Sequence, residues 1–401
     1  MFNQKRTLIE LFCLDGLFLT KIETNAKTVI LSVHSPRNSA HCLRCGQSTK
    51  RVTKKRVRNL HHGFCDDRLV LLRLTIRSFR CPQCGTFREH IPGIDRRRTT
   101  ARFRSLVIPK IRDRSFSSVA QEFGLSASSL IRSARELRQS MDVPWPTTGF
   151  NLGIDEHSFS GRDLMITLTN VSHHHLLDIL RNDRNLTLRE WLRNMPEQAR
   201  KLIRAVCIDM HSGYRSIVEQ ELPGVPIVID KFHVIQHLNW HLQQLRLLYT
   251  NQSYPLPRLL LEKNKEDLRD SERVWLQTIF RRYPSIAEFW RTKEIMRRLY
   301  RLHDAEKATA QFDALLDGLQ GDHRPRWDEL YRTLKRWRTY ILNYFTAGRI
   351  TNAYTEGVHT RIKLLKRISY GFRNKTNYIA KMTIAFLPLL TMIELLKHHP
   401  V

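Results

Sequence analysis

The chain has 401 residues, of which 41% are hydrophobic and 9% aromatic, and this composition excludes a disordered chain. At roughly 100–200 residues per domain, the length predicts two to four domains. Lys and Arg number 67 against 38 Asp and Glu, so the formal net charge is +29. A chain this basic is unlike an enzyme that acts on small neutral metabolites. Its charge favours a partner with a high density of negative charge, and nucleic acid is the first candidate.

Positive charge is concentrated early in the chain, where residues 1–150 carry 28 basic and 11 acidic side chains. Each phosphate that such a side chain neutralises releases counterions, so we expect binding that weakens steeply with salt. No export signal is apparent, and the longest apolar run, residues 382–393, is short and contains Pro388. We therefore expect a reducing compartment, with no disulfide framework among the seven cysteines.

Hydrophobic periodicity predicts a β-rich start followed by helices. Residues 8–90 are expected to form short strands with turns. Within them, Arg68 to Arg80 alternates apolar residues with a basic outer face, as in a half-buried strand. Residues 100–140 have helical periodicity, and two prolines and a glycine indicate a linker at 141–150.

The remainder of the chain predicts a mixed α/β segment and a long helical one. Strands are expected at 151–158, 163–171, 175–181, 203–209 and 225–230. Helices are expected at 187–201 and 213–221. Residues 233–345 should be entirely helical, and residues 352–397 should form two helices around a turn near Gly371.

Two Cys-x-x-Cys pairs give the strongest local signal. Each pair is followed at once by glycine, and the four residues are Cys42, Cys45, Cys81 and Cys84. Tight turns can direct four such thiolates at one structural Zn²⁺, which we predict over four ordinary buried cysteines. Possible substitute ligands are His41, His61 and His62. We interpret the other three cysteines as core residues: Cys13, Cys65 and Cys207.

Residues 115–137 predict a helix-turn-helix. Ala120 is a small residue where two short helices would cross, Gly124 makes the turn, and Ser126 opens the second helix. The second helix presents side chains that can reach base edges in the major groove: Ser128, Ser129, Arg132 and Arg135. A plain helical hairpin has the same pattern, but the basic surroundings favour DNA binding.

Three acidic residues, distant in the chain, fall on elements that can bring them together. Asp155 lies near the end of one predicted strand, Asp209 at the end of another, and Glu356 in a late helix. That helix carries a polar stripe opposite an apolar face: Asn352, Glu356, His359 and Lys363. Taken singly, each Asp is more typical of a turn or cap and the Glu of a solvated face.

Together, these carboxylates would repel one another and raise their pKa values unless cations were bound. Hard oxygen ligands suit Mg²⁺ or Mn²⁺. Two such ions about 4 Å apart can activate an attacking oxygen and stabilise a leaving one in phosphodiester chemistry. Lys363 could contact a phosphate of the bound DNA.

The element order, the Asp–Asp–Glu placement and the lysine seven residues after the glutamate resemble the ribonuclease-H-like core of DDE transposases. The fuller resemblance is to bacterial insertion-sequence transposases of the ISL3 family. It is carried by the cysteine pairs, the helix-turn-helix, and the blocks GIDEHSF, CIDMHSGY, VIDKFHV and TNAYTEGVHTRIKLLKRISYGFRN. The last two blocks are fairly specific, whereas the cysteine pairs and the hairpin are generic.

This resemblance implies an α/β fold: a ribonuclease-H-like catalytic core with an all-helical insertion, preceded by a zinc-binding β-rich domain and a helix-turn-helix. It implies Asp155, Asp209 and Glu356 as the triad of a two-metal site. The expected domains are 1–95 (zinc-binding), 96–145 (helix-turn-helix), 146–232 with 346–401 (catalytic) and 233–345 (helical insertion).

Two further residues, both in the block VIDKFHV, have open roles. Asp230 is either another carboxylate beside the triad or the N-cap of the following helix. His233 either orients a ligand or touches DNA, or it is a packed surface histidine. The basic stretch 366–381, with aromatic residues interleaved, can follow a DNA backbone through Arg373 and Lys375.

The expected activity is binding of the terminal inverted repeats of an insertion sequence, followed by metal-dependent strand cleavage and strand transfer. Because two ends must be held together, we expect a homodimer or larger assembly on double-stranded DNA. The expected location is the bacterial cytoplasm, associated with the nucleoid, with no membrane partner. Alternatives are a related nuclease resembling a junction resolvase, and a catalytically inactive DNA-binding regulator derived from a transposase.

Overall fold

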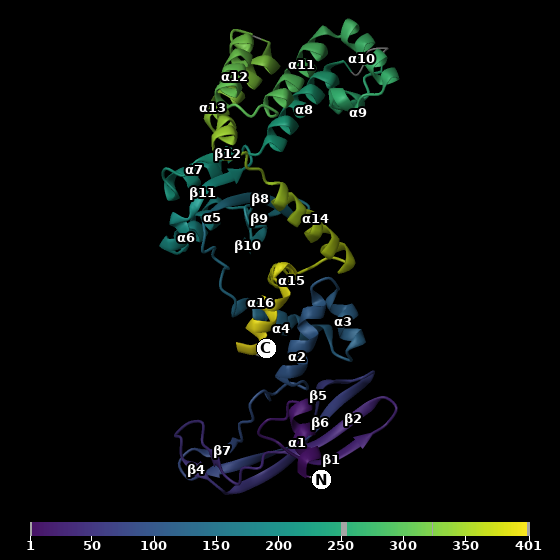
Figure 1. Ribbon diagram of the computed structural model, residues 1–401, viewed down its shortest axis with the longest axis vertical. Coiled ribbons are helices and arrows are strands. Elements are labelled where there is room, and N and C mark those ends of the chain that lie inside the picture. The colour runs from purple at the N-terminus through teal and green to yellow at the C-terminus, as the bar shows by residue number, and fades with distance from the viewer. Residues whose placement is uncertain (1, 250–254, 323, 399–401) are drawn as a thin grey trace. The chain divides into compact units, whose positions relative to one another are not determined.

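The computed structural model describes residues 2–249, 255–322 and 324–398 (Figure 1). The chain forms two compact units. The first is built from both chain ends, up to Asp142 and from Leu364 onward, and the second runs from Val143 to Lys363. All seven tryptophans belong to the second unit.

The first unit opens with a helix and a five-stranded sheet. Its elements are α1 (Phe2–Leu11), β1 (Phe18–Thr24), β2 (Thr28–His34), β5 (Val52–Cys65), β6 (Arg68–Cys81) and β7 (Gly85–Arg88). The strand order is β1-β2-β6-β5, and β7 pairs with the far end of β6. Val70, Leu72, Leu74 and Ile76 of β6 are buried, which confirms the predicted alternation.

A small hairpin and a helical group complete this unit. The hairpin is β3 (Ala40–His41) with β4 (Ser48–Thr49). The helices are α2 (Ala101–Val107), the 3-10 helix η1 (Ile108–Ile111), α3 (Phe116–Glu122), α4 (Ala127–Gln139), α15 (Lys375–Phe386) and α16 (Leu389–His398). Apolar side chains of the two C-terminal helices share one core with α2, α3 and α4, so the end of the chain helps to build this helical group.

A five-stranded sheet forms the base of the second unit. Its strands are β8 (Phe150–Ser160), β9 (Asp163–Asn170), β10 (His175–Ile179), β11 (Ile203–Ile208) and β12 (Ile227–Ile229). The order is β10-β9-β8-β11-β12. Strand β9 is antiparallel to both β10 and β8, and β11 is parallel to both β8 and β12. The carboxyl ends of β11 and β12 therefore meet at one edge, beside the middle of the long strand β8.

Four helices accompany this sheet (Figure 1): α5 (Asn185–Arg193), α6 (Glu197–Lys201), α7 (Ser212–Glu221) and α14 (Ala353–Ile368). The single helix expected at 187–201 is two helices. The first ends at Arg193, with Asn194 as its C-cap, and Pro196 lies directly before α6. A proline there is tolerated because the first amides of a helix need no partner within it.

A helical segment connects β12 to α14 (Figure 1): α8 (Lys231–Leu248), α9 (Arg258–Glu262), the 3-10 helix η2 (Lys265–Asp267), α10 (Asp270–Arg282), α11 (Pro284–Leu299), α12 (Ala305–Leu319) and α13 (Pro325–Thr346). Its helical character confirms the prediction, although residues 250–254 and 323 lie outside the described residues. Trp290, Trp327 and Trp337 are buried here, whereas Trp240 and Trp275 are partly exposed.

The end of the chain differs from the prediction in two ways. Residues 352–397 contain three helices, because Pro388 separates α15 from α16. Residues from Leu364 onward, which the sequence analysis placed with the catalytic domain, pack in the first unit. The division into four functional domains stays a prediction.

Near the start of the chain, three details correct the sequence analysis. Helix α1 was not expected, and β5 and β6 have 14 residues each instead of being short. Cys13 is not a core residue: it follows α1 with a φ of 49° and is exposed. Cys65 is half-buried, and Cys207 is fully buried as predicted.

Among the described residues, no single helix is long and apolar enough to cross a membrane. The pair α15 and α16, bent by 118°, passes the criteria of length and composition only when taken together.

Candidate functional site

The sheet of the second unit brings acidic residues to one edge. In the parallel register, Cys207 of β11 lies opposite Gly153 of β8, and Ile208 lies opposite Ile229 of β12. Asp209 and Asp230 each follow the last residue of their strand, and Asp155 lies two residues beyond Gly153. Side chains of three neighbouring strands therefore converge, as expected where parallel strands end.

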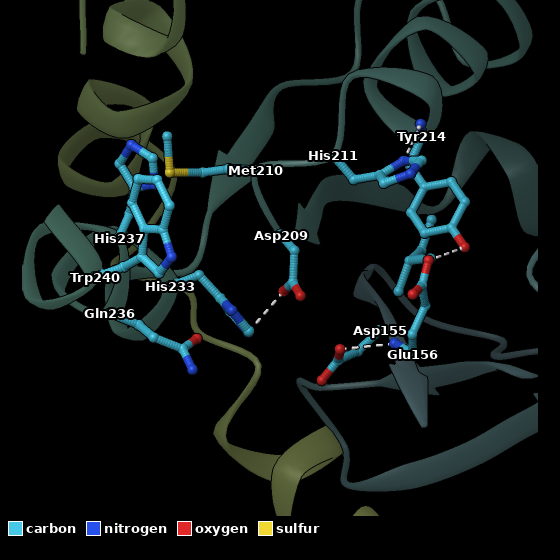
Figure 2. Close-up of a pocket in the computed structure, with 11 residues that line it drawn as sticks. Asp155, Glu156, Asp209, Met210, His211, Tyr214, His233, Gln236, His237 and Trp240 are labelled. Atoms are coloured by element: carbon cyan, nitrogen blue, oxygen red, sulfur yellow. Dashed lines mark hydrogen bonds and ion pairs between the residues drawn. The ribbon is translucent and has the colours of Figure 1, made fainter. Parts of the chain in front are cut away.

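Asp155, Asp209 and His233 form one group whose potential ligand atoms all lie within 4.8 Å of one another. The Nε2 atom of His233 is 2.8 Å from Oδ1 of Asp209. The backbone N–H of Glu156 donates to Oδ1 of Asp155 at 2.7 Å. Figure 2 shows the two carboxylates and the imidazole facing a common space.

Glu356 lies in a second group, with Asp230 and the same His233, again with all potential ligand atoms within 4.8 Å. The three predicted triad members thus do not form one group of their own. They are distributed over two groups that share His233. Asp230 has both roles that the sequence left open: its Oδ1 accepts from Phe232 N at 3.2 Å as the N-cap of α8, and it belongs to the acidic group.

Burial and neighbouring charges shift the pKa values of Asp155, Asp230, Glu356 and His233. Burial and then the charge of Asp209 raise the pKa of Asp155 to about 7. Burial also raises the pKa values of Asp230 and Glu356. Burial would lower the pKa of His233, but its hydrogen bond to Asp209 and the surrounding carboxylates raise that pKa to about 8. A cation placed here would relieve this repulsion.

Asn352, which directly precedes α14, joins the two groups through its hydrogen bonds. Its backbone N–H donates to Oδ2 of Asp230 at 3.2 Å, and its Nδ2 donates to the carbonyl of Ile154 at 3.3 Å. Its carbonyl accepts from Glu356 N at 2.9 Å, so one fully buried residue links β8, Asp230 and the glutamate. Gly153 makes this approach possible, because a Cβ there would lie 2.9 Å from Asn352 Oδ1.

A cavity of about 380 Å³ opens beside the first group. Figure 2 shows the labelled lining: Asp155, Glu156, Asp209, Met210, His211, Tyr214, His233, Gln236, His237 and Trp240. The sequence analysis missed most of these residues. The spacing of His233, Gln236, His237 and Trp240 along one helical face was a usable signal, since these positions recur at steps of three and four.

The other two polar positions of α14 lie away from this cavity. His359 is buried, with Nε2 2.9 Å from Thr167 Oγ1 and Nδ1 3.5 Å from Oδ2 of Asp155. It therefore contacts the Asp155 carboxylate without lining the cavity. Lys363 is exposed and is not among the cavity residues.

The two cysteine pairs come together in the first unit. Potential ligand atoms of Cys42, Cys45, Cys81 and Cys84 all lie within 4.8 Å of one another. Gly46 N donates to Cys42 O at 2.8 Å, and Gly46 and Gly85 have φ values of 74° and 82°, so each pair sits on a tight turn. The three histidines considered as substitutes are not members of this group.

In the helix-turn-helix region, Ser115 and Ser126 cap α3 and α4 through their side chains. Ser128, Arg132 and Arg135 of α4 are exposed, and Ser129 is half-buried. Arg373 is exposed and Lys375 half-buried. Lys381, the last residue of the basic stretch, does not belong to its exposed surface: it is fully buried, and its Nζ donates to the carbonyls of Arg112 and Arg114. The interpretation of the rest of the stretch stays a prediction.

Known proteins share this sequence pattern. A family model described as a transposase, of the DDE type and the ISL3 group, matches residues 152–382. The transposase for insertion sequence element IS1001 of Bordetella parapertussis is 23% identical over 361 residues, covering 86% of this chain and 88% of that protein. The transposase for IS1557 of Mycobacterium tuberculosis strain H37Rv is 29% identical over 143 residues, covering 36% of this chain and 30% of that protein.

The acid-lined sheet edge thus lies within a DDE transposase domain of mixed α/β structure. The matched segment covers more than half of the chain and contains all four carboxylates described above. The chain belongs to the ISL3 family of DDE transposases.

Proposed function

We propose that this protein binds the terminal inverted repeats of an insertion sequence and catalyses metal-dependent DNA strand cleavage and strand transfer. The observation that carries the proposal is the pair of acidic groups sharing His233 at one sheet edge. The strand order β10-β9-β8-β11-β12, with the first acid on the central strand, supports a ribonuclease-H-like core.

Asp155, Asp209 and Glu356 are the proposed catalytic triad, and Asp230 and His233 are accessory. Their donor set of carboxylate oxygens fits Mg²⁺ or Mn²⁺. Burial, and then the charge of Asp209, raises the pKa of Asp155, and a bound cation would favour its charged form. Bound ions would polarise the attacking and leaving oxygens of a phosphodiester. Asn352 holds the glutamate near Asp230, and the helix cap by Asp230 fixes the first turn that carries His233.

The first unit is proposed to recognise the DNA ends. Cys42, Cys45, Cys81 and Cys84 would hold a structural Zn²⁺, for which four thiolates on two tight turns are the typical donor set. The exposed face of α4, with Arg132 and Arg135, would enter a major groove. Synapsis of two ends would require a homodimer or larger assembly, located in the cytoplasm with the nucleoid.

A cleavage and strand-transfer assay with labelled ends, in Mg²⁺ or Mn²⁺, tests this function. Asp209→Asn should abolish cleavage while end binding survives. Glu190→Gln, which removes an exposed carboxylate of α5 in the same unit, is the matched control and should retain both. Cleavage by Asp209→Asn at the wild-type rate would remove Asp209 from the triad. Cleavage without joining in the wild-type protein would favour the resolvase-like nuclease instead.

A further inference from the structure

Strand β6 continues beyond the apolar core of its sheet, and its core-facing pattern changes there. Val70, Leu72, Leu74 and Ile76 are buried on one face. The next residue on that face is Ser78, which is half-buried. Since side chains two apart share a face, the far end of the strand presents a hydroxyl where an apolar residue would otherwise pack.

Two cations flank this serine in the register of the sheet. Lys54 of β5 lies opposite Ser78, and Ser78 lies opposite Arg88 of β7. The three residues therefore form a row across three strands. Neighbouring strands are about 4.8 Å apart, so the two cationic walls start roughly 10 Å from each other with the small serine between them.

The row lies in a surface trough of about 470 Å³. Its lining adds another cation and more hydroxyls: Thr53, Lys54, Arg56, Ser78, Thr86, Phe87 and Arg88. None of these described lining residues is a carboxylate. The three cationic side chains, Lys54, Arg56 and Arg88, are exposed. Glu89, which directly follows β7, is buried and paired with Arg77, with 2.7 Å between Oε2 and Nη2.

We propose that this trough binds the sugar-phosphate backbone of double-stranded DNA, as a contact surface separate from the helix-turn-helix. Lys54 and Arg88 bind phosphate oxygens from both sides, and the hydroxyls of Ser78 and Thr86 donate to the oxygens between them. Lys54 and Arg56 are two residues apart on one strand, about 6.8 Å, which is comparable to the separation of successive phosphates along a DNA strand. Contacts of this kind fix register without reading sequence.

The trough also depends on the cysteine turns. Strand β6 ends at Cys81 and β7 begins at Gly85, so the second cysteine pair forms the turn between two of the three strands. Arg80 N donates to Arg51 O at 2.9 Å, which joins the same region to the start of β5. The proposed Zn²⁺ would therefore hold the trough in shape, although the contact chemistry belongs to the cations and hydroxyls.

This inference rests on the proposed function, and salt-dependent binding to a short duplex of arbitrary sequence separates the two. The full chain is titrated without Mg²⁺ or Mn²⁺ at several salt concentrations. The logarithm of the affinity falls as the logarithm of the salt concentration rises, and each lost phosphate contact makes this slope shallower by about 0.9. Lys54→Ser with Arg88→Ser should therefore make the slope shallower by about 1.8. Lys21→Ser with Lys27→Ser, which removes two exposed charges at the other end of the sheet, should leave it unchanged.

The floor of the trough gives a second, independent variant. Ser78→Asp places a carboxylate between the cations and should weaken binding at least tenfold, whereas Ser78→Thr should retain affinity. Equal zinc content in all variants reports that the domain is folded. A wild-type slope in the Lys54–Arg88 variant, or an equal loss in the Lys21–Lys27 control, overturns the trough. Absence of any salt-dependent duplex binding by the wild-type chain overturns the proposed function itself.

Discussion

Replacing Asp155 with asparagine is expected to stabilise the metal-free second unit, and more so as the pH rises. The ordinary pKa of this carboxyl is 3.8, and burial with the nearby Asp209 raises it to about 7 in the folded protein. The folded state therefore binds a proton that the unfolded state releases between these two values. Stability then falls as the pH rises through this window and is lowest above it. Asparagine resembles the protonated acid at every pH.

The magnitude follows from 1.36 kcal/mol for each pH unit between the two pKa values. Deprotonation of Asp155 in the unfolded state lowers the unfolding free energy of the wild type but not that of the asparagine variant. The variant should therefore be more stable than the wild type by roughly 1.6 kcal/mol at pH 5 and by roughly 4 kcal/mol at pH 8. The difference in unfolding free energy between variant and wild type should therefore grow by roughly 2–3 kcal/mol from pH 5 to pH 8. The hydrogen bond that Glu156 N donates to Asp155 offsets part of this difference in unfolding free energy at each pH. It has little effect on how much the difference grows from pH 5 to pH 8.

Tryptophan fluorescence during urea unfolding, with a chelator present, measures this difference. Because every tryptophan lies in the second unit, the signal should be independent of any loss of the proposed Zn²⁺ from the first. Glu190→Gln, an exposed carboxylate, should show no growth with pH. Mn²⁺ at pH 8 should stabilise the wild type and leave Asp155→Asn unchanged. A difference that is constant or shrinks as the pH rises would refute the reasoning about Asp155.

Three further outcomes are expected. Gly153→Ala should destabilise the second unit by about 1–3 kcal/mol in the same fluorescence assay, because its Cβ would lie 2.5 Å from Thr169 Oγ1; an unchanged midpoint would contradict this packing. Lys381→Met should lower the thermal midpoint of the first unit, measured by circular dichroism, because the carbonyls of Arg112 and Arg114 lose their hydrogen-bond donor. Lys375→Met, at a half-buried lysine of the same helix, is the control and should leave the midpoint unchanged. Cys81→Ser should lower zinc content and expose β6 and β7 to proteolysis, whereas Cys13→Ser should change neither.

Sequence patterns located the acidic residues well because strand ends are visible as breaks in apolar runs. Asp209 and Asp230 each follow three buried residues of a strand, and parallel pairing then brings them to one edge. The sharing of His233 by two groups was not predictable. It depends on the direction in which the first turn of α8 presents its side chains, which the cap at Asp230 sets.

The course of the chain near its C-terminus was harder to predict for a different reason. The stretch 366–381 is basic and aromatic, and such a composition is typical of a surface that follows DNA. In the structure Tyr378 and Lys381 are buried, and Lys381 Nζ donates to the carbonyls of Arg112 and Arg114, 269 and 267 positions away in the chain. No local pattern in the sequence encodes contacts over such separations.

Among the residues that the structure describes, two lysines are fully buried and act as structural hydrogen-bond donors. Lys293 is fully buried, and its Nζ donates to the carbonyls of Leu261, Glu262 and Lys263, while Lys381 does the same for two other carbonyls. Amine-directed acylation of the native chain should therefore leave both residues unlabelled until unfolding. The net charge of the chain therefore overstates the number of cationic side chains that can contact a polyanion. That number is better obtained from the exposure of each lysine and arginine.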